Sequence, residues 1–266
     1  MKVVVFDFDE TLGHFGQLGD FVTSLEEGFG RPIKREVLYK LLDIYPFTLR
    51  TDLFRILNLL KRRKQRRDIN KVIIYTNNMG PRSWVLSIKR YLELKLNYKL
   101  FDRVISAYKV NGVQIEKKRT SHDKTYKDLL AAANLPKNTR VLFFDDQPHS
   151  INKHPNVIGI RLMPYTYIMN IREMLDHFLH NRLLKSLISD KEGFSGFMYK
   201  KLKRYDKPEG LVAAQNEKGY VFHLIDKFSQ EWIADEFGFN FIPSPWIVIF
   251  LEASSITKVA ESKQVL

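Results

Sequence analysis

Apolar runs of strand length recur through the first 165 residues without alternating between apolar and polar side chains. The clearest lie at residues 2–6 (KVVVF), 71–75 (KVIIY), 140–144 (RVLFF) and 157–162 (VIGIRL), and a further strand is expected at 104–108. Strands that are apolar on both faces are typical of parallel sheets covered on each side. Such runs exclude a sheet with one face in water.

Segments with helical spacing separate these strands. They lie at residues 34–42, 50–64, from Pro81 onward, and at 125–133. Strands that alternate with helices predict an α/β fold, with a Rossmann-like parallel sheet and helices on both of its faces. After the first strand, residues 13–46, which include the first of these helices, are expected to form a small flap or cap-like insertion.

The pattern changes in the last third of the chain. A long helix is expected from residue 166 to about 187, which would close a main domain of residues 1–187. Residues 188–266 lose the strand–helix rhythm and are expected to form a small C-terminal α+β appendage. Within it, a strand is expected at 220–225 and a helix near 228–237.

The composition limits the cellular location and the class of partner expected for this chain. The chain has no cysteine, which excludes disulfides and thiolate zinc sites and favours a reducing, intracellular location, cytoplasmic or nuclear. No apolar run has the length of a signal core or a membrane span. The net charge of +13 favours an anionic partner, such as nucleic acid or an acidic protein. For KRRKQRR at 61–67, a solvated helix end is favoured over a nucleic-acid patch.

Polar residues follow three of the apolar runs at their carboxyl ends, where ligands of such sheets bind. Asp7 and Asp9 follow the first run, Thr76-Asn77 the second, and Asp145-Asp146 the run at 140–144. Close carboxylates repel, so a shared proton or a cation must hold them together. Mg²⁺ suits this set because it takes hard oxygen ligands. A hydroxyl and backbone N–H groups at Thr76 and Asn77 suit phosphate oxygens.

This ordered set resembles the haloacid dehalogenase-like (HAD) phosphatase superfamily. The family's D-x-D-x-T motif matches VVVFDFDET, its strand followed by Thr matches VIIYT, and its closing acidic pair matches VLFFDD. The sequence is most similar to the FCP/SCP-like, NIF-like branch of carboxy-terminal-domain phosphatases, through Glu10, Thr11, Leu12 and His14. KDLL and DDQPHS match that branch too. The resemblance covers roughly residues 2–165.

The resemblance implies a Mg²⁺-dependent phosphatase that forms an aspartyl-phosphate. Asp7 would be the nucleophile, and Asp9 the acid that protonates the leaving oxygen and then the base that activates water. Thr76, Asn77 and a lysine would hold the phosphate. Lys127 is preferred for that role because KDL begins there, with Lys124 as the alternative.

The metal set implied by the resemblance is Asp7, Asp9, Asp145 and Asp146. Asp7 would contribute its side chain and Asp9 its main-chain carbonyl. The second carboxylate would come from Asp146 more readily than from Asp145. Asp145 would then orient the lysine or a metal-bound water. Thr11 completes the first motif and supports the site.

The sequence does not decide between several classes of substrate. Residues 13–46 are short for a large cap, which favours an open site and a macromolecule, with a phosphoprotein (Ser/Thr) preferred. Asn77 and Asn78 after Thr76, and Thr51 rather than proline after Arg50, depart from the branch. TNN is more similar to small-molecule and polynucleotide phosphatases, so a nucleic-acid end or a small phosphate ester is the alternative. An inactive HAD-like binding or scaffold module is the alternative of another class.

Overall fold

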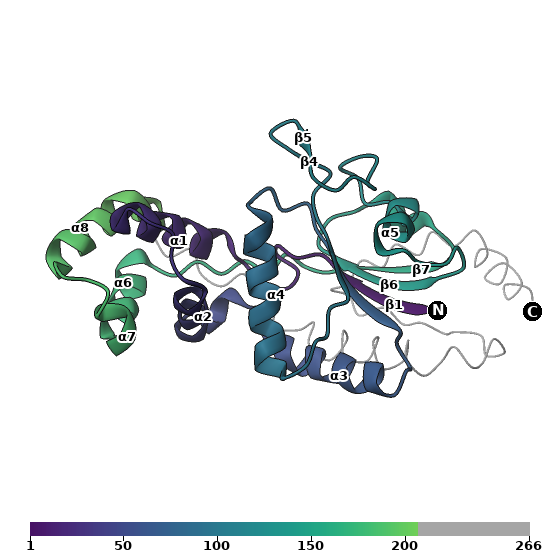
Figure 1. The fold of residues 1–266 in the computed structure, drawn as a ribbon, viewed down its shortest axis with the longest axis horizontal. Helices are drawn as coiled ribbons and strands as arrows, with labels where there is room; N and C mark the ends of the chain where they lie inside the picture. Colours follow the sequence, from purple (N-terminus) through teal and green to yellow (C-terminus); the bar gives the residue numbers. More distant parts are fainter. Residues whose placement is uncertain (207–266) are drawn as a thin grey trace, which may run out of the picture.

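A five-stranded parallel sheet forms the centre of the chain. The structure is a computed structural model that describes residues 1–206. The strands are β1 (Lys2–Phe6), β2 (Lys71–Tyr75), β3 (Arg103–Ile105), β6 (Arg140–Asp145) and β7 (Val157–Arg161), in the order β3-β2-β1-β6-β7 (Figure 1). The predicted α/β fold is confirmed, and the strand expected at 104–108 ends earlier, at Ile105.

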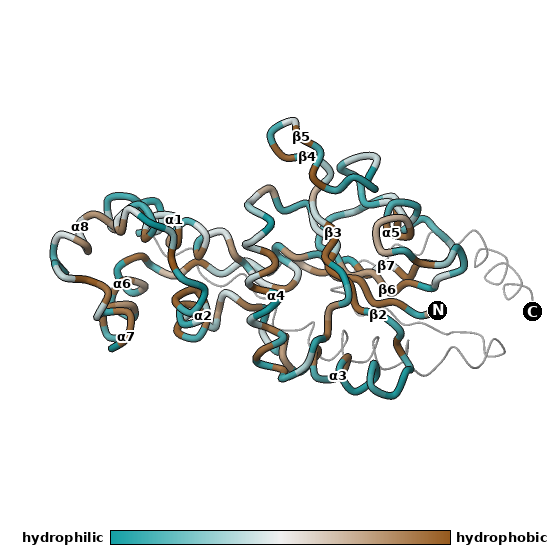
Figure 2. The backbone as a smooth tube through the Cα atoms, viewed as in Figure 1, coloured by the Kyte–Doolittle hydropathy of each residue, from teal (hydrophilic) through white to brown (hydrophobic). Residues whose placement is uncertain are grey.

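The central strand β1 shows why the apolar runs do not alternate. Val3 and Val5 belong to one hydrophobic cluster, whereas Val4 and Phe6 belong to the other, so both faces of the strand are buried. Alternate residues of a strand point to opposite faces, and each face here needs an apolar side chain. The tube coloured by hydropathy shows this apolar centre beside the more polar helix α3 (Figure 2).

Helices cover both faces of the sheet, as predicted. On the face of Val4 and Phe6 lie α3 (Leu53–Gln65) and α4 (Arg82–Leu96). On the face of Val3 and Val5 lies α5 (Tyr126–Ala133). Strands β4 (Lys109–Val110) and β5 (Val113–Gln114) follow β3 in the chain and precede α5. They form a small hairpin that projects from the rest of the fold (Figure 1).

A helical lobe stands at one side of the sheet (Figure 1, left). It comprises α1 (Gly16–Phe29), α2 (Arg35–Ile44), α6 (Ile171–His180), α7 (Arg182–Lys185) and α8 (Lys191–Leu202). The segment expected as a flap or cap is thus half of this lobe. Phe194 of α8 stacks on Phe29 of α1 and on Phe178 of α6. Residues on both sides of the expected boundary at 187 therefore share one core.

The single helix expected from 166 to 187 is wrong. Helix α6 begins only after Asn170, whose side chain accepts the N–H of Arg172, and Asn181 caps α7 in the same way. Asparagine favours such caps over helix interiors, because its short side chain bonds nearby backbone N–H groups. The elements expected at 220–225 and 228–237 lie outside the described residues.

Three short 3-10 turns complete the described part, η1 (Pro46–Thr48), η2 (Ser150–Lys153) and η3 (Lys203–Tyr205). Among residues 1–206, none of the helices combines the length and apolar character that a membrane crossing requires.

Candidate functional site

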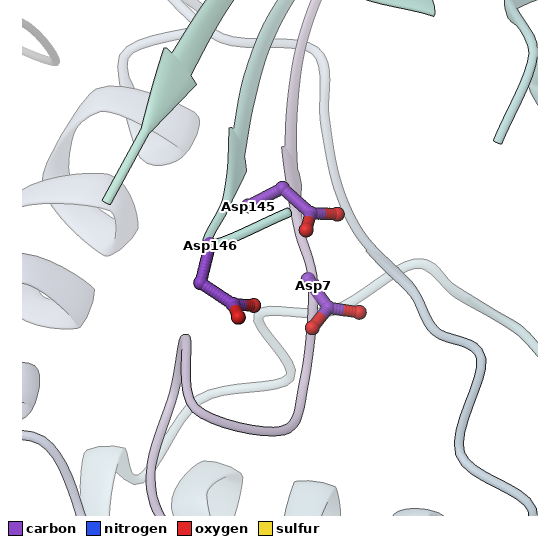
Figure 3. Close-up of side chains that lie close together, drawn as sticks. All are labelled: Asp7, Asp145 and Asp146. Carbon is purple, nitrogen blue, oxygen red and sulfur yellow. The ribbon is translucent and has the colours of Figure 1, made fainter. Parts of the chain in front are cut away.

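Three aspartates meet at the carboxyl ends of β1 and β6 (Figure 3). Oxygens of Asp7, Asp145 and Asp146 lie within 4.8 Å of one another, and all three side chains are buried. The register explains the meeting, because Phe6 pairs with Phe144 and the Asp7 N–H donates to the Phe144 carbonyl at 2.8 Å. Neighbouring parallel strands in register deliver their next residues to one place.

Lys124 supplies the countercharge within this cluster. Its ammonium donates to a carboxylate oxygen of Asp7 and to Asp145 Oδ2, the latter at 2.7 Å, and its side chain is 2% exposed. Burial acts to lower the pKa of Lys124, but Asp7 and Asp145 together hold it above its ordinary value. The lysine therefore stays charged in an interior where an unpaired charge would be costly.

The preference for Lys127 is corrected by this geometry. Lys127 is exposed on α5, whereas Lys124 is buried against Asp7. Thr125 is the N-cap of α5, its hydroxyl accepting the Asp128 N–H at 3.0 Å. The helix starts at the same sheet edge as the site, so the residue just before its cap reaches the aspartates. The Thr-x-x-Asp capping pattern at 125–128 is the sequence signal that could have favoured Lys124 over Lys127.

Asp145 is held almost entirely by the protein itself. Its Oδ1 accepts the Gln147 N–H at 2.8 Å, its Oδ2 accepts from Lys124, and His149 Nε2 lies 3.7 Å from Oδ2. His149 in turn contacts Asp123 at 3.1 Å through Nδ1. No role was predicted for His149 from the sequence. In DDQPH it follows Asp145 by four residues, which was the available signal that it could reach the Asp145 carboxylate.

Asp9 lies beside the end of β2. Its Oδ2 accepts the side-chain amide of Asn78 at 2.8 Å, and the Asn78 backbone N–H donates to the Thr76 hydroxyl at 2.9 Å. Burial raises the pKa of Asp9 to about 6, with the Asn78 hydrogen bond opposing the shift. A carboxyl group with a pKa in that range can release and accept a proton near neutrality.

Burial also raises the pKa of Asp7 to about 6. The charge of Lys124 opposes this rise, and the neighbouring Asp145 adds to it. Two buried carboxylates beside one ammonium leave a surplus negative charge, which a bound cation would compensate.

A tight turn that Arg50 clamps follows Asp9. Glu10 has φ +58°, and the buried Arg50 guanidinium donates to the carbonyls of Glu10, Thr11 and Met163, each at 2.7 Å. The Thr11 hydroxyl is buried and has no hydrogen-bond partner among residues 1–206. In the sequence, Arg50 was noted only because Thr51 follows it in place of proline. The carbonyls that Arg50 contacts are 39 or more residues away in the chain, so no local sequence pattern predicts these contacts.

Thr76 and Asn77 differ in where their side chains lie. Thr76 is buried at the end of β2, at the site, whereas the Asn77 amide turns away and donates to the His122 carbonyl at 3.0 Å. The buried Arg119 braces the same strand end by donating to the carbonyls of Thr76 and Ser106, both at 3.0 Å. Arg119 was not singled out from the sequence either.

The donor set fits a hard cation. Asp7 and Asp146 offer buried carboxylate oxygens, the ligand type that Mg²⁺ prefers. Both carboxylate oxygens of Asp145 accept hydrogen bonds, from Lys124 and from the Gln147 N–H, whereas Lys124 binds one oxygen of Asp7 and the Gln147 side chain binds one oxygen of Asp146. Asp7 and Asp146 are therefore the two side chains better suited to hold the ion.

Comparisons with known proteins add no relative: no family model matches the chain, and searches of curated proteins and of solved structures found no match.

Proposed function

We propose that the chain is a Mg²⁺-dependent phosphatase that hydrolyses a phosphomonoester through an aspartyl-phosphate on Asp7. The observation that carries the proposal is the convergence of Asp7, Lys124 and Asp146 at one sheet edge, with Asp9 and Thr76 beside them. These are the group types that phosphoryl transfer requires: a nucleophile, an acid/base and positive charge around the phosphoryl oxygens. The resemblance to HAD-like phosphatases supports the same assignment.

The reaction proceeds in two balanced steps. The Asp7 carboxylate attacks phosphorus, the ester P–O bond breaks, and the leaving oxygen takes a proton from Asp9. Water then attacks the phosphorus of the aspartyl-phosphate and gives its proton to Asp9. The bond between Asp7 and phosphorus breaks, which restores both carboxyl groups and releases inorganic phosphate.

The remaining residues orient the nucleophile and stabilise the negative charge of the phosphoryl group. Lys124 keeps Asp7 in place and neutralises the phosphoryl group, and Asp145 fixes the Lys124 ammonium by its 2.7 Å hydrogen bond. The Thr76 hydroxyl donates to a phosphoryl oxygen. Mg²⁺ held by Asp7 and Asp146 would supply further positive charge to the phosphoryl oxygens.

Hydrolysis of an aryl phosphate by wild type and by Asp7→Asn tests the proposal. With Mg²⁺ present, the variant should lose on the order of 10³-fold or more in kcat, because no oxygen nucleophile remains. Circular dichroism should show that both proteins fold alike. Full activity of the variant would refute the mechanism. Wild type that binds Mg²⁺ but hydrolyses no phosphate ester would indicate an inactive binding module instead.

The substrate we propose is a macromolecule that carries a phosphate. The net charge of +13 supports an anionic one, and both a phosphoprotein and a nucleic-acid end fit an open site. The surface next to Asp9 separates these two classes.

A further inference from the structure

A groove of about 590 Å³ leads away from Asp9 between α1 and the start of α4. Asp9 and Asn78 line it near the site, together with Gly16 at the start of α1. Glu26 lines it ten residues further along the same helix. Since a helix rises about 1.5 Å per residue, the groove extends about 15 Å from the site. Its volume is in the range of ligand-binding clefts.

The position of Asp9 identifies which part of the substrate enters this groove. The acid that protonates the leaving oxygen must lie on the leaving-group side of the phosphorus. Asp9 is that acid in the proposed function, on which this inference rests. The leaving alcohol, and whatever chain it belongs to, therefore occupies the groove rather than the space around Lys124.

Glycines on α1 keep the groove open opposite an aromatic ring. A Cβ at Gly19 would meet only the Trp84 ring, at 3.9 Å, and one at Gly16 only the His14 ring, at 3.9 Å. Trp84 is half-buried in the groove wall on α4. The Trp84 ring, which lines the groove beside these glycines, is an apolar planar surface suited to stack a planar group.

The charges of the groove favour an anion at its far end. Asp20 is bound by Arg204 and the Tyr205 hydroxyl, and Glu26 accepts the Ile33 N–H at 3.0 Å. Lys34 and Arg35 are exposed there, and their side chains have no hydrogen-bond or ion-pair partner within residues 1–206. Asp20 is thus paired with a cation of the protein and Glu26 is held by a backbone N–H, and the two cations remain for a ligand.

We propose that the groove binds the terminal nucleotides of a nucleic-acid strand whose end phosphate is hydrolysed. The base next to the scissile phosphate stacks on Trp84, and a following phosphodiester contacts Lys34 and Arg35. An extended peptide is the less suitable occupant. The groove walls are mainly the helices α1 and α4, whose backbone groups are already bonded. The rest of the lining, chiefly the segments at 32–34 and 78–81, contains no β-strand, so the groove offers no strand edge for peptide main-chain hydrogen bonds.

Filling the groove at Gly19 tests this inference. The substrates are an oligonucleotide with a 3′- or 5′-terminal phosphate, a phosphoserine peptide, and glycerol 2-phosphate, whose leaving alcohol is small. Gly19→Leu should lower kcat/KM for the oligonucleotide at least about tenfold relative to glycerol 2-phosphate, mainly through KM. Gly196→Leu is the matched control, because Gly196 is an exposed helical glycine on α8 with open space around it.

Binding of the oligonucleotide, followed by tryptophan fluorescence, gives a readout that does not depend on turnover. Quenching that is absent in Trp84→Phe and weakened in a Lys34→Ala, Arg35→Ala double variant supports the inference. It is overturned if the peptide is the better substrate and Gly19→Leu lowers its kcat/KM, or if Gly19→Leu leaves oligonucleotide binding unchanged. Wild type that hydrolyses none of the three substrates but quenches on the oligonucleotide would refute the proposed function and leave the groove's ligand supported.

Discussion

Lys124 is the residue on which the charge balance of the site depends. Lys124→Met leaves Asp7 and Asp145 close together without a cation, and it removes positive charge from the phosphoryl group. We expect kcat/KM for an aryl phosphate to fall about 10²- to 10³-fold. Lys127→Met, three residues away on the exposed side of α5, should change it less than twofold. A larger loss in Lys127→Met than in Lys124→Met would return the role to Lys127.

Asp146 is predicted to matter for the metal more than for the fold. Loss of residues that merely support a metal ligand already weakens metal binding 10- to 100-fold, so Asp146→Asn should weaken Mg²⁺ binding by at least about tenfold. Titration calorimetry measures the affinity directly. Asp176→Asn, on the exposed surface of α6, is the matched control and should bind Mg²⁺ as wild type does. Unchanged affinity in Asp146→Asn would remove it from the metal set.

Arg50 links three carbonyls around the turn after Asp9. Arg50→Met leaves these carbonyls without their donor in a buried place, and each unsatisfied group costs about 1–3 kcal/mol. We expect a loss of roughly 3 kcal/mol in the free energy of unfolding, measured by urea titration. A change below about 0.5 kcal/mol, the range of surface substitutions, would show that the clamp is dispensable.

The residues of the site were predictable to different degrees for a physical reason. Asp7, Asp9, Thr76 and the pair at 145–146 follow apolar strands directly, so their position at the sheet edge can be read locally. Arg50 acts through carbonyls 39 to 113 residues away, and Arg119 braces the strand ends through carbonyls 13 and 43 residues away, which no local pattern reveals. Lys124 was only the alternative because the family match at KDL favoured Lys127, and the N-cap at Thr125, which places Lys124 at the site, was not considered.

At the scale of elements, helix α8 depends on aromatic contacts with α1 and α6. Phe194→Ala removes the ring that stacks on Phe29 and Phe178, and we expect a loss of about 2–4 kcal/mol in the free energy of unfolding. Leu183→Ala on α7, where the side chain is 66% exposed, should cost less than about 0.5 kcal/mol. Urea unfolding of both variants gives the comparison, and similar costs would mean that α8 adds little to the lobe.

The helices beside the sheet were predictable, and so was α2 of the lobe, expected at 34–42 and found at Arg35–Ile44, whereas α1 and α8 were not. Helices α3, α4 and α5 each bury one stripe against a strand face, which makes their period visible in the sequence. In α8 the apolar residues lack one clear stripe, because Phe194 packs on α1 and α6 while glycines interrupt the helix. Its partner α1 lies more than 160 residues earlier in the chain. Packing across that separation is invisible to periodicity.

At the scale of the whole molecule, the parallel sheet brings the ends of three strands to one edge, and the helical lobe adds a wall beside that edge. The order β3-β2-β1-β6-β7 places β1 between β2 and β6, so the strand that carries Asp7 is flanked by Thr76 on one side and by Asp145 on the other. Strand order is not readable from single strands, yet it decides that these groups meet. The proposed chemistry depends on this convergence of Asp7, Thr76 and Asp145.

The central claim is that Asp7 becomes phosphorylated during turnover. The most direct measurement is mass spectrometry of peptides from the enzyme, quenched in acid while it hydrolyses an aryl phosphate with Mg²⁺. The account predicts a phosphoryl group on the peptide that contains Asp7, removed by hydroxylamine and absent in Asp7→Asn or without Mg²⁺. Continued hydrolysis by Asp7→Asn, or a phosphoryl group on a different residue, would contradict it.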